Sequence, residues 1–274
     1  MVSGPSAVAP PAVGPPAIHV ERSGRGAPVV FWHGWGLNLR VYDALRAALN
    51  PDFRTIAVDL PGHGRSAWAA GDPAAGFPQA GLLDTLPQGT TLVGWSLGAQ
   101  LALRAAARAP GRIARLVLIG ATPRFVRSED WPDAVASELL AQMHARLEQD
   151  CAGAVHDFLA LQVRGSRDAA AVQATLRAAL LEHGAAQPAA LAAGLAALAS
   201  TDLRPLLHAI DVPALVIAGQ YDRVTPPAAS AALAAALPRG RYLECPRAGH
   251  APFLSHLREL LPELRHFMST AQVA

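Results

Sequence analysis

The chain has 274 residues, of which 51% are hydrophobic and 16% are charged, and this balance excludes an intrinsically disordered protein. The formal net charge is only +2, and all 23 basic residues are arginines. This pattern is typical of a compositional bias rather than of a basic surface selected for nucleic acid, so we expect no nucleic-acid partner.

Residues 1–16 are rich in Pro, Ala, Val and Gly, with no basic start and no continuous apolar stretch. They predict a flexible leader rather than a signal peptide. The longest apolar helical runs, at 189–199 and 228–237, are too short to cross a bilayer. Cys151 and Cys245 lack metal-ligand spacing, which favours two reduced thiols. We therefore expect a cytoplasmic protein with no membrane contact, and a monomer as the default.

Strand-like and helix-like segments alternate along most of the chain. Strands are predicted at 17–21, 28–32, 53–59, up to 93, 113–119, 214–219 and 241–245, and helices at 38–49, 80–86, 97–109, 227–237 and 257–268. This alternation predicts an α/β fold with a mostly parallel sheet flanked by helices. Between 121 and 200 the strands vanish, which predicts a helical cap insertion. We divide the chain into a leader at 1–16, a core at 17–120 and 201–274, and a cap at 121–200.

The sequence Gly-Trp-Ser-Leu-Gly at 94–98 matches the G-x-S-x-G pattern of a nucleophile elbow. Ser96 falls where the strand ending at 93 meets the next helix, and Gly94 and Gly98 would let the backbone make a sharp turn there. The start of that helix directs free N–H groups toward the same point. We therefore expect Ser96 to be a nucleophile.

A serine hydroxyl needs a base to take its proton, and the base needs a carboxylate to orient it. His250 directly follows the last predicted strand, and Asp222 ends the strand before it. Asp222 is favoured over Asp211, which precedes a strand, and over Asp202, at the boundary of the insertion. The order Ser96, Asp222, His250 is that of the α/β hydrolases.

Acyl transfer also needs donors for the developing oxyanion. The backbone N–H groups of Leu97, after the nucleophile, and Trp35, in the loop after the first parallel strand, are the candidates. We interpret His33, His63 and Asp59 as scaffold residues of neighbouring turns. No phosphate loop or dinucleotide fingerprint appears, so we expect no cofactor and no metal for the reaction.

Several motifs together resemble the pimeloyl-[acyl-carrier protein] methyl ester esterases, the carboxylesterases of biotin synthesis. They are His-Gly-Trp-Gly-Leu-Asn at 33–38, Val-Asp-Leu-Pro-Gly-His-Gly-Arg-Ser at 58–66, the elbow, Phe-Leu-Ala-Leu-Gln at 158–162, Thr-Asp-Leu-Arg at 201–204 and His-Ala-Pro-Phe at 250–253. The resemblance implies hydrolysis of the methyl ester of a pimeloyl chain on acyl carrier protein. It implies a catalytic triad of Ser96, Asp222 and His250, an oxyanion site at Trp35 and Leu97, and an acyl channel lined by Phe158, Leu159, Ala160, Leu161 and Gln162.

The cap departs from the family pattern where basic residues are expected to meet the acidic carrier protein. Gly153 and Asp157 stand before Phe158, and the candidate carrier contacts are Arg164, Arg167 and Arg177 instead. Two alternatives stay open at this point. One is a generalist esterase, lactonase or carbon–carbon bond hydrolase of the same fold, and the other is a non-catalytic ligand-binding protein.

Overall fold

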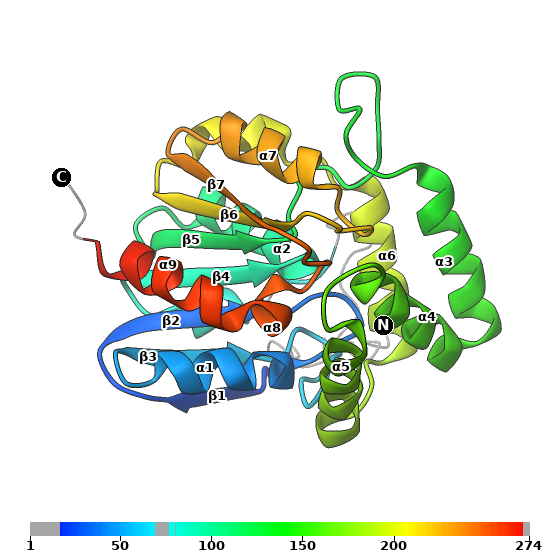
Figure 1. The fold of residues 1–274 in the computed structure, drawn as a ribbon, viewed down its shortest axis with the longest axis horizontal. Helices are drawn as coiled ribbons and strands as arrows, with labels where there is room; N and C mark the ends of the chain where they lie inside the picture. Colours follow the sequence, from blue (N-terminus) through cyan, green and yellow to red (C-terminus); the bar gives the residue numbers. More distant parts are fainter. Residues whose placement is uncertain (1–16, 69–76, 80, 271–274) are drawn as a thin grey trace, which may run out of the picture.

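The computed structural model describes residues 17–68, 77–79 and 81–270, and the predicted leader at 1–16 lies outside them. The described residues form a seven-stranded sheet with the order β1-β3-β2-β4-β5-β6-β7 (Figure 1). β1 pairs antiparallel with β3, and every other neighbouring pair is parallel. The prediction of a mostly parallel sheet is confirmed. The strands are β1 (Val20–Ser23), β2 (Ala27–Trp32), β3 (Phe53–Val58), β4 (Thr90–Trp95), β5 (Ile113–Ile119), β6 (Ala214–Gly219) and β7 (Gly240–Cys245).

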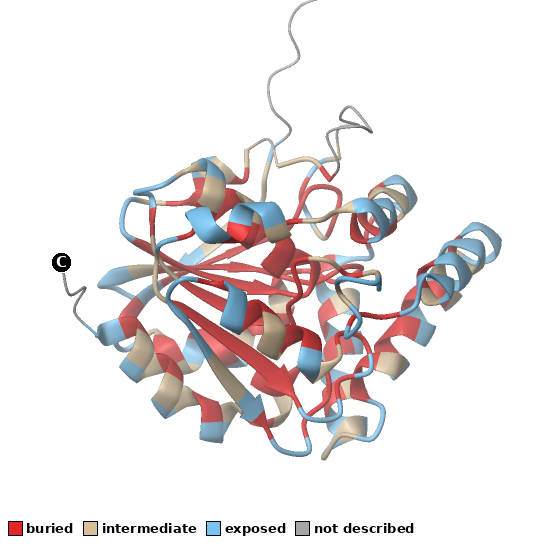
Figure 2. Cartoon of the chain, turned by 90° about the horizontal axis from the view of Figure 1, so that it is seen from above, coloured by how far each residue is buried: buried red, intermediate tan, exposed pale blue. Residues whose placement is uncertain are grey.

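Helices cover both faces of the sheet, and this explains why its inner strands are continuous apolar runs. One face packs against α2 (Leu97–Arg108) and α7 (Pro227–Ala236), and the other packs against α1 (Asp43–Leu49) and α9 (Leu257–Ser269). Figure 2 shows the buried residues gathered in the sheet and on the inward sides of these helices. The sheet is therefore a rigid base for the loops at its carboxyl edge.

Several predicted bounds were wrong. The edge strand expected at 17–21 begins three residues later, as β1 (Val20–Ser23). Two predicted helices were wrong for local reasons. The segment expected as one helix at 38–49 is a 3-10 turn, η1 (Leu39–Tyr42), followed by α1. The Asn38 side chain caps η1 by accepting a hydrogen bond from the Arg40 N–H at 3.1 Å. The helix expected at 80–86 is a single 3-10 turn, η3 (Leu83–Thr85), between Gly81, which has a φ of +80°, and Pro87. Residue 80 lies outside the described residues.

Four helices lie between β5 and β6 and stand together beside the sheet (Figure 1). The two ends of this segment are joined: Arg124 Nη1 lies 3.1 Å from Asp202 Oδ2, and the Leu203 N–H donates to Pro123 O at 2.9 Å. The segment is thus closed at its base, where it leaves the sheet. Its helices are α3 (Ser137–Gln149), α4 (Cys151–Val163), α5 (Ala169–His183) and α6 (Pro188–Ser200).

The remaining short elements are η4 (Arg204–Ala209) and α8 (Pro252–Ser255). Cys151 and Cys245 are both free cysteines. Across the described ranges, no helix has the length and apolar content to span a membrane.

Candidate active site

Ser96 occupies a sharp turn between β4 and α2. Its backbone has φ 55° and ψ −116°, an unfavourable region for a residue with a side chain, and such strain is concentrated at functional sites. A Cβ on Gly98 would lie 2.2 Å from Trp32 O, and a Cβ on Gly94 would lie 2.6 Å from Gly98 O. Only glycine fits at both positions, because strand, turn and helix backbones touch there.

Asp222 and His250 meet above the sheet, on the loops after β6 and β7. Asp222 Oδ2 lies 2.7 Å from His250 Nδ1, and both side chains are fully buried. The other carboxylate oxygen, Oδ1, accepts hydrogen bonds from the N–H groups of Val224 and Thr225, each at 2.8 Å. The carboxylate is therefore fixed in one orientation toward the imidazole.

The backbone of His250 is held from two sides. Its N–H donates to Gln162 O on α4 at 2.8 Å, and its carbonyl accepts from Trp95 Nε1 at the same distance. Gly120 follows β5 with a φ of +52°, and a Cβ there would lie 2.7 Å from the imidazole Nδ1 and Cε1. The imidazole therefore packs directly on the Gly120 backbone.

Ser96 and His250 flank the same dipeptide at the end of β5. The Ser96 N–H donates to Ile119 O at 2.9 Å, while Gly120 is in contact with the imidazole. Within the described part of the chain, His250 Nε2 is buried and has no hydrogen-bond partner. Among the described residues the structure therefore joins His250 to Asp222 and shows no hydrogen bond from Ser96 Oγ to His250 Nε2.

The loop after β2 lies against Ser96. A Cβ on Gly34 would lie 3.4 Å from Ser96 Cβ, so the Gly34 backbone lies close to the serine. Leu97 is the first residue of α2, so its N–H has no partner within the helix. Leu97 thus follows Ser96 directly, and Gly34, the residue before Trp35, lies close to the Ser96 side chain.

Two buried histidines shape this loop. His33 Nε2 accepts from the Leu60 N–H at 2.9 Å, and His63 Nε2 accepts from the Gly36 N–H at 3.3 Å. Burial lowers the pKa of both, and that of His63 falls to about 3. Each can accept these hydrogen bonds only as a neutral imidazole. In the structure both are scaffold contacts.

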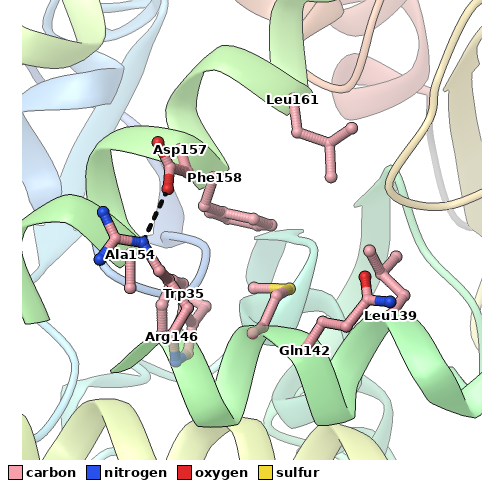
Figure 3. A pocket seen from close by; sticks show the side chains of 9 residues that line it. Trp35, Leu139, Gln142, Arg146, Ala154, Asp157, Phe158 and Leu161 are labelled. Atoms are coloured by element: carbon pink, nitrogen blue, oxygen red, sulfur yellow. Dashed lines mark hydrogen bonds and ion pairs between the residues drawn. The ribbon is translucent and has the colours of Figure 1, made fainter. Parts of the chain in front are cut away.

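A cavity of about 250 Å³ lies between α3 and α4 and reaches Trp35. Figure 3 shows Phe158 and Leu161 of α4 directed into this space, with Leu139 of α3 beyond them. The Trp35 indole meets the Phe158 ring edge-on, with 5.1 Å between centroids, and donates from Nε1 to Leu191 O at 2.8 Å. The cavity is lined by Trp35, Leu139, Gln142, Met143, Arg146, Ala154, Asp157, Phe158 and Leu161.

The five residues expected to line an acyl channel separate around α4, because successive residues of a helix point about 100° apart. Phe158 and Leu161 line the cavity. Leu159 packs in the hydrophobic cluster under α5 and Ala160 is exposed, so neither lines it. Gln162 is buried beside His250, and its amide atoms have no hydrogen-bond partner among the described residues.

The rival acids lie elsewhere. Asp202 accepts hydrogen bonds from Arg204 Nη2 at 2.7 Å and from Arg124. The hydrogen bond from Arg204 has the largest effect, and together the two arginines lower the pKa of Asp202 to about 2. Asp211 is exposed before β6, at the opposite end of that strand from Asp222. Neither is placed to orient His250.

Sequence reasoning missed the contribution of α3 and the role of Gly120. Leu139, Met143 and Leu147 recur on α3 at the four-residue spacing of one helix face, and that signal could have indicated a wall facing α4. Arg146 was missed too. It lies at the cavity wall and pairs with Asp157 through Nε at 3.1 Å (Figure 3).

The sequence matches the family described as "alpha/beta hydrolase fold" over residues 27–257. Solved structures of similar fold include an esterase (EaEST) from Exiguobacterium antarcticum, with a TM-score of 0.83 and 22% identity over 93% of this chain and 96% of that one. They also include the enol-lactonase from Burkholderia xenovorans LB400, with a TM-score of 0.77 and 25% identity over 93% of this chain and 97% of that one. Fold and family match define the class: the chain is an α/β hydrolase.

Curated relatives are more similar in sequence. The pimeloyl-[acyl-carrier protein] methyl ester esterase of Nitrosomonas europaea is 41% identical over 87% of this chain and 94% of its own length. The esterase of the same name from Stenotrophomonas maltophilia (strain K279a) is 41% identical over 94% of this chain and 98% of its own length. The chain therefore belongs to the family of the pimeloyl-[acyl-carrier protein] methyl ester esterases.

Proposed function

We propose that this chain is a serine esterase that hydrolyses the methyl ester of pimeloyl-[acyl-carrier protein], releasing methanol, as a step of biotin synthesis. Ser96 is the nucleophile, His250 the general base and Asp222 the residue that orients the base. The backbone N–H groups of Trp35 and Leu97 bind the oxyanion. The contact of Asp222 with His250 and the cavity that reaches Trp35 support these roles.

In the first half of the reaction, Ser96 Oγ attacks the ester carbonyl carbon while His250 Nε2 takes the hydroxyl proton. The tetrahedral oxyanion collapses, the bond to the methoxy oxygen breaks, and His250 returns the proton so that methanol leaves. In the second half a water molecule, deprotonated by His250, attacks the acyl-enzyme. The products are the free pimeloyl carboxylate and Ser96 with its proton restored.

The observation that carries the substrate assignment is the apolar cavity between α3 and α4. Trp35 is one of its lining residues, and Gly34, the residue before Trp35, lies close to Ser96, although Ser96, Asp222 and His250 do not line the cavity themselves. Five methylene groups separate the two carbonyls of a pimeloyl chain, and their burial is worth about 0.8 kcal/mol each. The walls are mostly apolar, with Gln142 and the Arg146–Asp157 pair as the polar part, and this supports binding of such a chain with its methyl ester toward Ser96.

The arginines proposed to contact the carrier protein differ in how free they are. Arg164 is exposed and, among the described residues, has no ion-pair partner, whereas Arg167 pairs with Glu259 at 2.8 Å and Arg177 contacts His156. Arg146 joins them as a candidate, because it lies at the wall of the cavity. All four arginines belong to the helical segment between β5 and β6, which supports docking of an acidic carrier protein on this segment.

The test compares kcat/KM for three methyl or nitrophenyl esters: the carrier-bound pimeloyl methyl ester, free dimethyl pimelate and p-nitrophenyl butyrate. The proposal predicts a clear preference for the carrier-bound ester, and that Arg164→Gln lowers only the rate for this ester. Arg146→Gln, at the cavity wall, should lower the rate for the carrier-bound ester more than the rate for free dimethyl pimelate. Arg258→Gln, on α9, is the matched control. Turnover of the nitrophenyl ester alone would support the generalist alternative instead. A cytoplasmic location and a monomeric state are parts of the proposal, which cell fractionation and sedimentation velocity test.

A further inference from the structure

A second group of ligating side chains lies where the sheet edge meets the end of α5. His19, Glu21 and His183 each offer one atom within 4.8 Å of the other two. Glu21 Oε1 lies 3.5 Å from His183 Nε2 and 3.7 Å from His19 Nε2. Tetrahedral zinc with bonds of 2.0–2.1 Å places its ligand atoms about 3.3 Å apart. Each imidazole nitrogen therefore lies within a few tenths of an ångström of that spacing from Glu21 Oε1, while the two nitrogens lie within 4.8 Å of each other.

His183 is oriented as metal-binding histidines are. Its Nδ1 lies 3.2 Å from Asp59 Oδ2, and the two side chains are buried. A proton on Nδ1 satisfies this carboxylate and leaves the lone pair on Nε2, which faces Glu21. A carboxylate behind the ligating histidine is the usual outer partner of a zinc site. Asp59 itself is held by the N–H groups of Leu39 at 2.8 Å and Arg65 at 2.9 Å.

His19 is also fixed and has an unused nitrogen. Its backbone N–H donates to Ser66 Oγ at 2.8 Å, and its carbonyl accepts from the Asp59 N–H at 3.1 Å. Its ring lies edge-on to the His183 ring, with 5.4 Å between centroids. Within the described part of the chain, His19 Nε2 is buried with no hydrogen-bond partner. A buried ring nitrogen without a hydrogen-bond partner is costly unless something binds it.

A cation already occupies part of this space. Arg40 Nε donates to His183 Nε2 at 3.0 Å, and Nη2 of the same guanidinium contacts Glu21. Nη1 reaches Asp43 at 3.1 Å, and that carboxylate is at the surface. Arg46 pairs with the second oxygen of Glu21 at 3.5 Å. Arg40 Nε also lies 3.6 Å from Glu182 Oε1, a second carboxylate at the surface. The guanidinium can therefore turn toward Asp43 or Glu182 and leave Glu21 Oε1 and His183 Nε2 to another cation.

We propose that His19, Glu21 and His183 form a binding site for a divalent transition-metal ion of the zinc class, for which Arg40 is the competing cation. Two imidazoles and one carboxylate are a common zinc ligand set, with water in the fourth position. The bound ion would tie α5 to β1 and so brace the helices beside the active site. It takes no part in ester hydrolysis.

The experiment is calorimetric titration of the metal-free full chain with Zn²⁺ at neutral pH. The proposal predicts one ion per chain, and at least a roughly 30-fold loss of affinity in both His19→Gln and His183→Gln. His144→Gln is the matched control, because His144 is an exposed histidine with Glu148 at 3.5 Å. The Zn²⁺ affinity of His144→Gln should equal that of the unaltered chain. Arg40→Gln, which removes the competing charge, should bind Zn²⁺ more tightly.

Thermal unfolding gives a second readout. At a hundredfold excess of Zn²⁺ over its Kd, the unfolding midpoint should rise by about 5 °C. The rise should disappear in His19→Gln and persist in His144→Gln. If His183→Gln does not fold, the zinc affinities of His19→Gln and Arg40→Gln, measured against the unaltered chain, still test the proposal. The proposal is overturned if the unaltered chain does not bind Zn²⁺, or if His19→Gln binds it as well as the unaltered chain.

Discussion

His250 Nδ1 lies 2.7 Å from Asp222 Oδ2, and neither side chain is exposed to solvent. The two residues are 28 positions apart and come together because β6 and β7 are parallel neighbours whose carboxyl ends share one edge of the sheet. A buried carboxylate at this distance fixes the tautomer with the proton on Nδ1. Nε2 is then the atom left to accept a proton.

Replacement of Asp222 by Asn should lower kcat about 10,000-fold with little change of fold. Its Oδ1 contacts to Val224 and Thr225 can be kept by the amide oxygen, but the amide NH₂ would face His250 Nδ1 and favour the other tautomer. Ester hydrolysis and circular dichroism of the same preparations measure this. Asp211→Asn, an exposed acid before β6, should stay within about twofold of the unaltered chain. Equal losses in the two variants would contradict the role given to Asp222.

Replacement of Gly98 by Ala should lower the free energy of unfolding by at least about 3 kcal/mol. The new Cβ would meet Trp32 O at 2.2 Å and His33 O at 2.6 Å, and backbone atoms cannot move aside cheaply. Gly89→Ala is the comparison, because its Cβ meets nothing within 4 Å and only its φ of +73° is unfavourable. That variant should lose about 1 kcal/mol. Urea unfolding of both distinguishes a steric clash from backbone strain.

Acid should destabilise the fold through His63. Burial lowers its folded pKa to about 3 from an ordinary 6.5, so between these values the unfolded chain binds a proton that the folded chain does not. Stability from this group is complete above pH 6.5 and is lost as the pH falls toward 3, by about 2 to 3 kcal/mol at pH 4.5. Urea unfolding between pH 7 and 4.5 measures the slope, which should be shallower in His63→Gln. A slope unchanged by the substitution would show that other groups cause the acid loss.

Replacement of Leu161 by Trp should reduce acyl-chain binding selectively. The larger side chain would fill part of the 250 Å³ cavity between α3 and α4. We expect kcat/KM for the pimeloyl methyl ester to fall at least about tenfold, with p-nitrophenyl acetate changed less than about twofold. Leu181→Trp, at an exposed position on α5, controls for the added indole. A similar loss on both esters would mean that the acyl chain lies elsewhere.

The strands were the best-predicted part of the fold, because a buried parallel strand is a continuous apolar run. The predicted bounds of β5 and β6 agree with the structure. The turn at Ser96 and the loop that carries Asp222 could be located because each follows such a run, while His250 was located because it follows the last predicted strand, β7. Short elements were less predictable: η1 depends on the Asn38 cap and η3 on Gly81 and Pro87.

The cavity could not be predicted from local sequence. It depends on how α3 packs against α4, and the hydrophobic face of α3 alone does not say which helix it meets. Gly120 was missed because glycine is needed there only to make room for the His250 imidazole. That ring would lie 2.7 Å from a Cβ at position 120, and His250 is 130 positions away in the sequence. The meeting of His19 with His183 likewise depends on where α5 docks on the sheet edge.

The central claim is that Ser96 attacks the methyl ester of a carrier-bound pimeloyl chain. Methanol release from pimeloyl-[acyl-carrier protein] methyl ester tests it most directly, with the unaltered chain compared with Ser96→Ala. We expect rapid, stoichiometric release by the unaltered chain and at least a roughly 10,000-fold slower release by the variant. Release that persists in Ser96→Ala, or no release by the unaltered chain while simple esters are hydrolysed, would contradict the account.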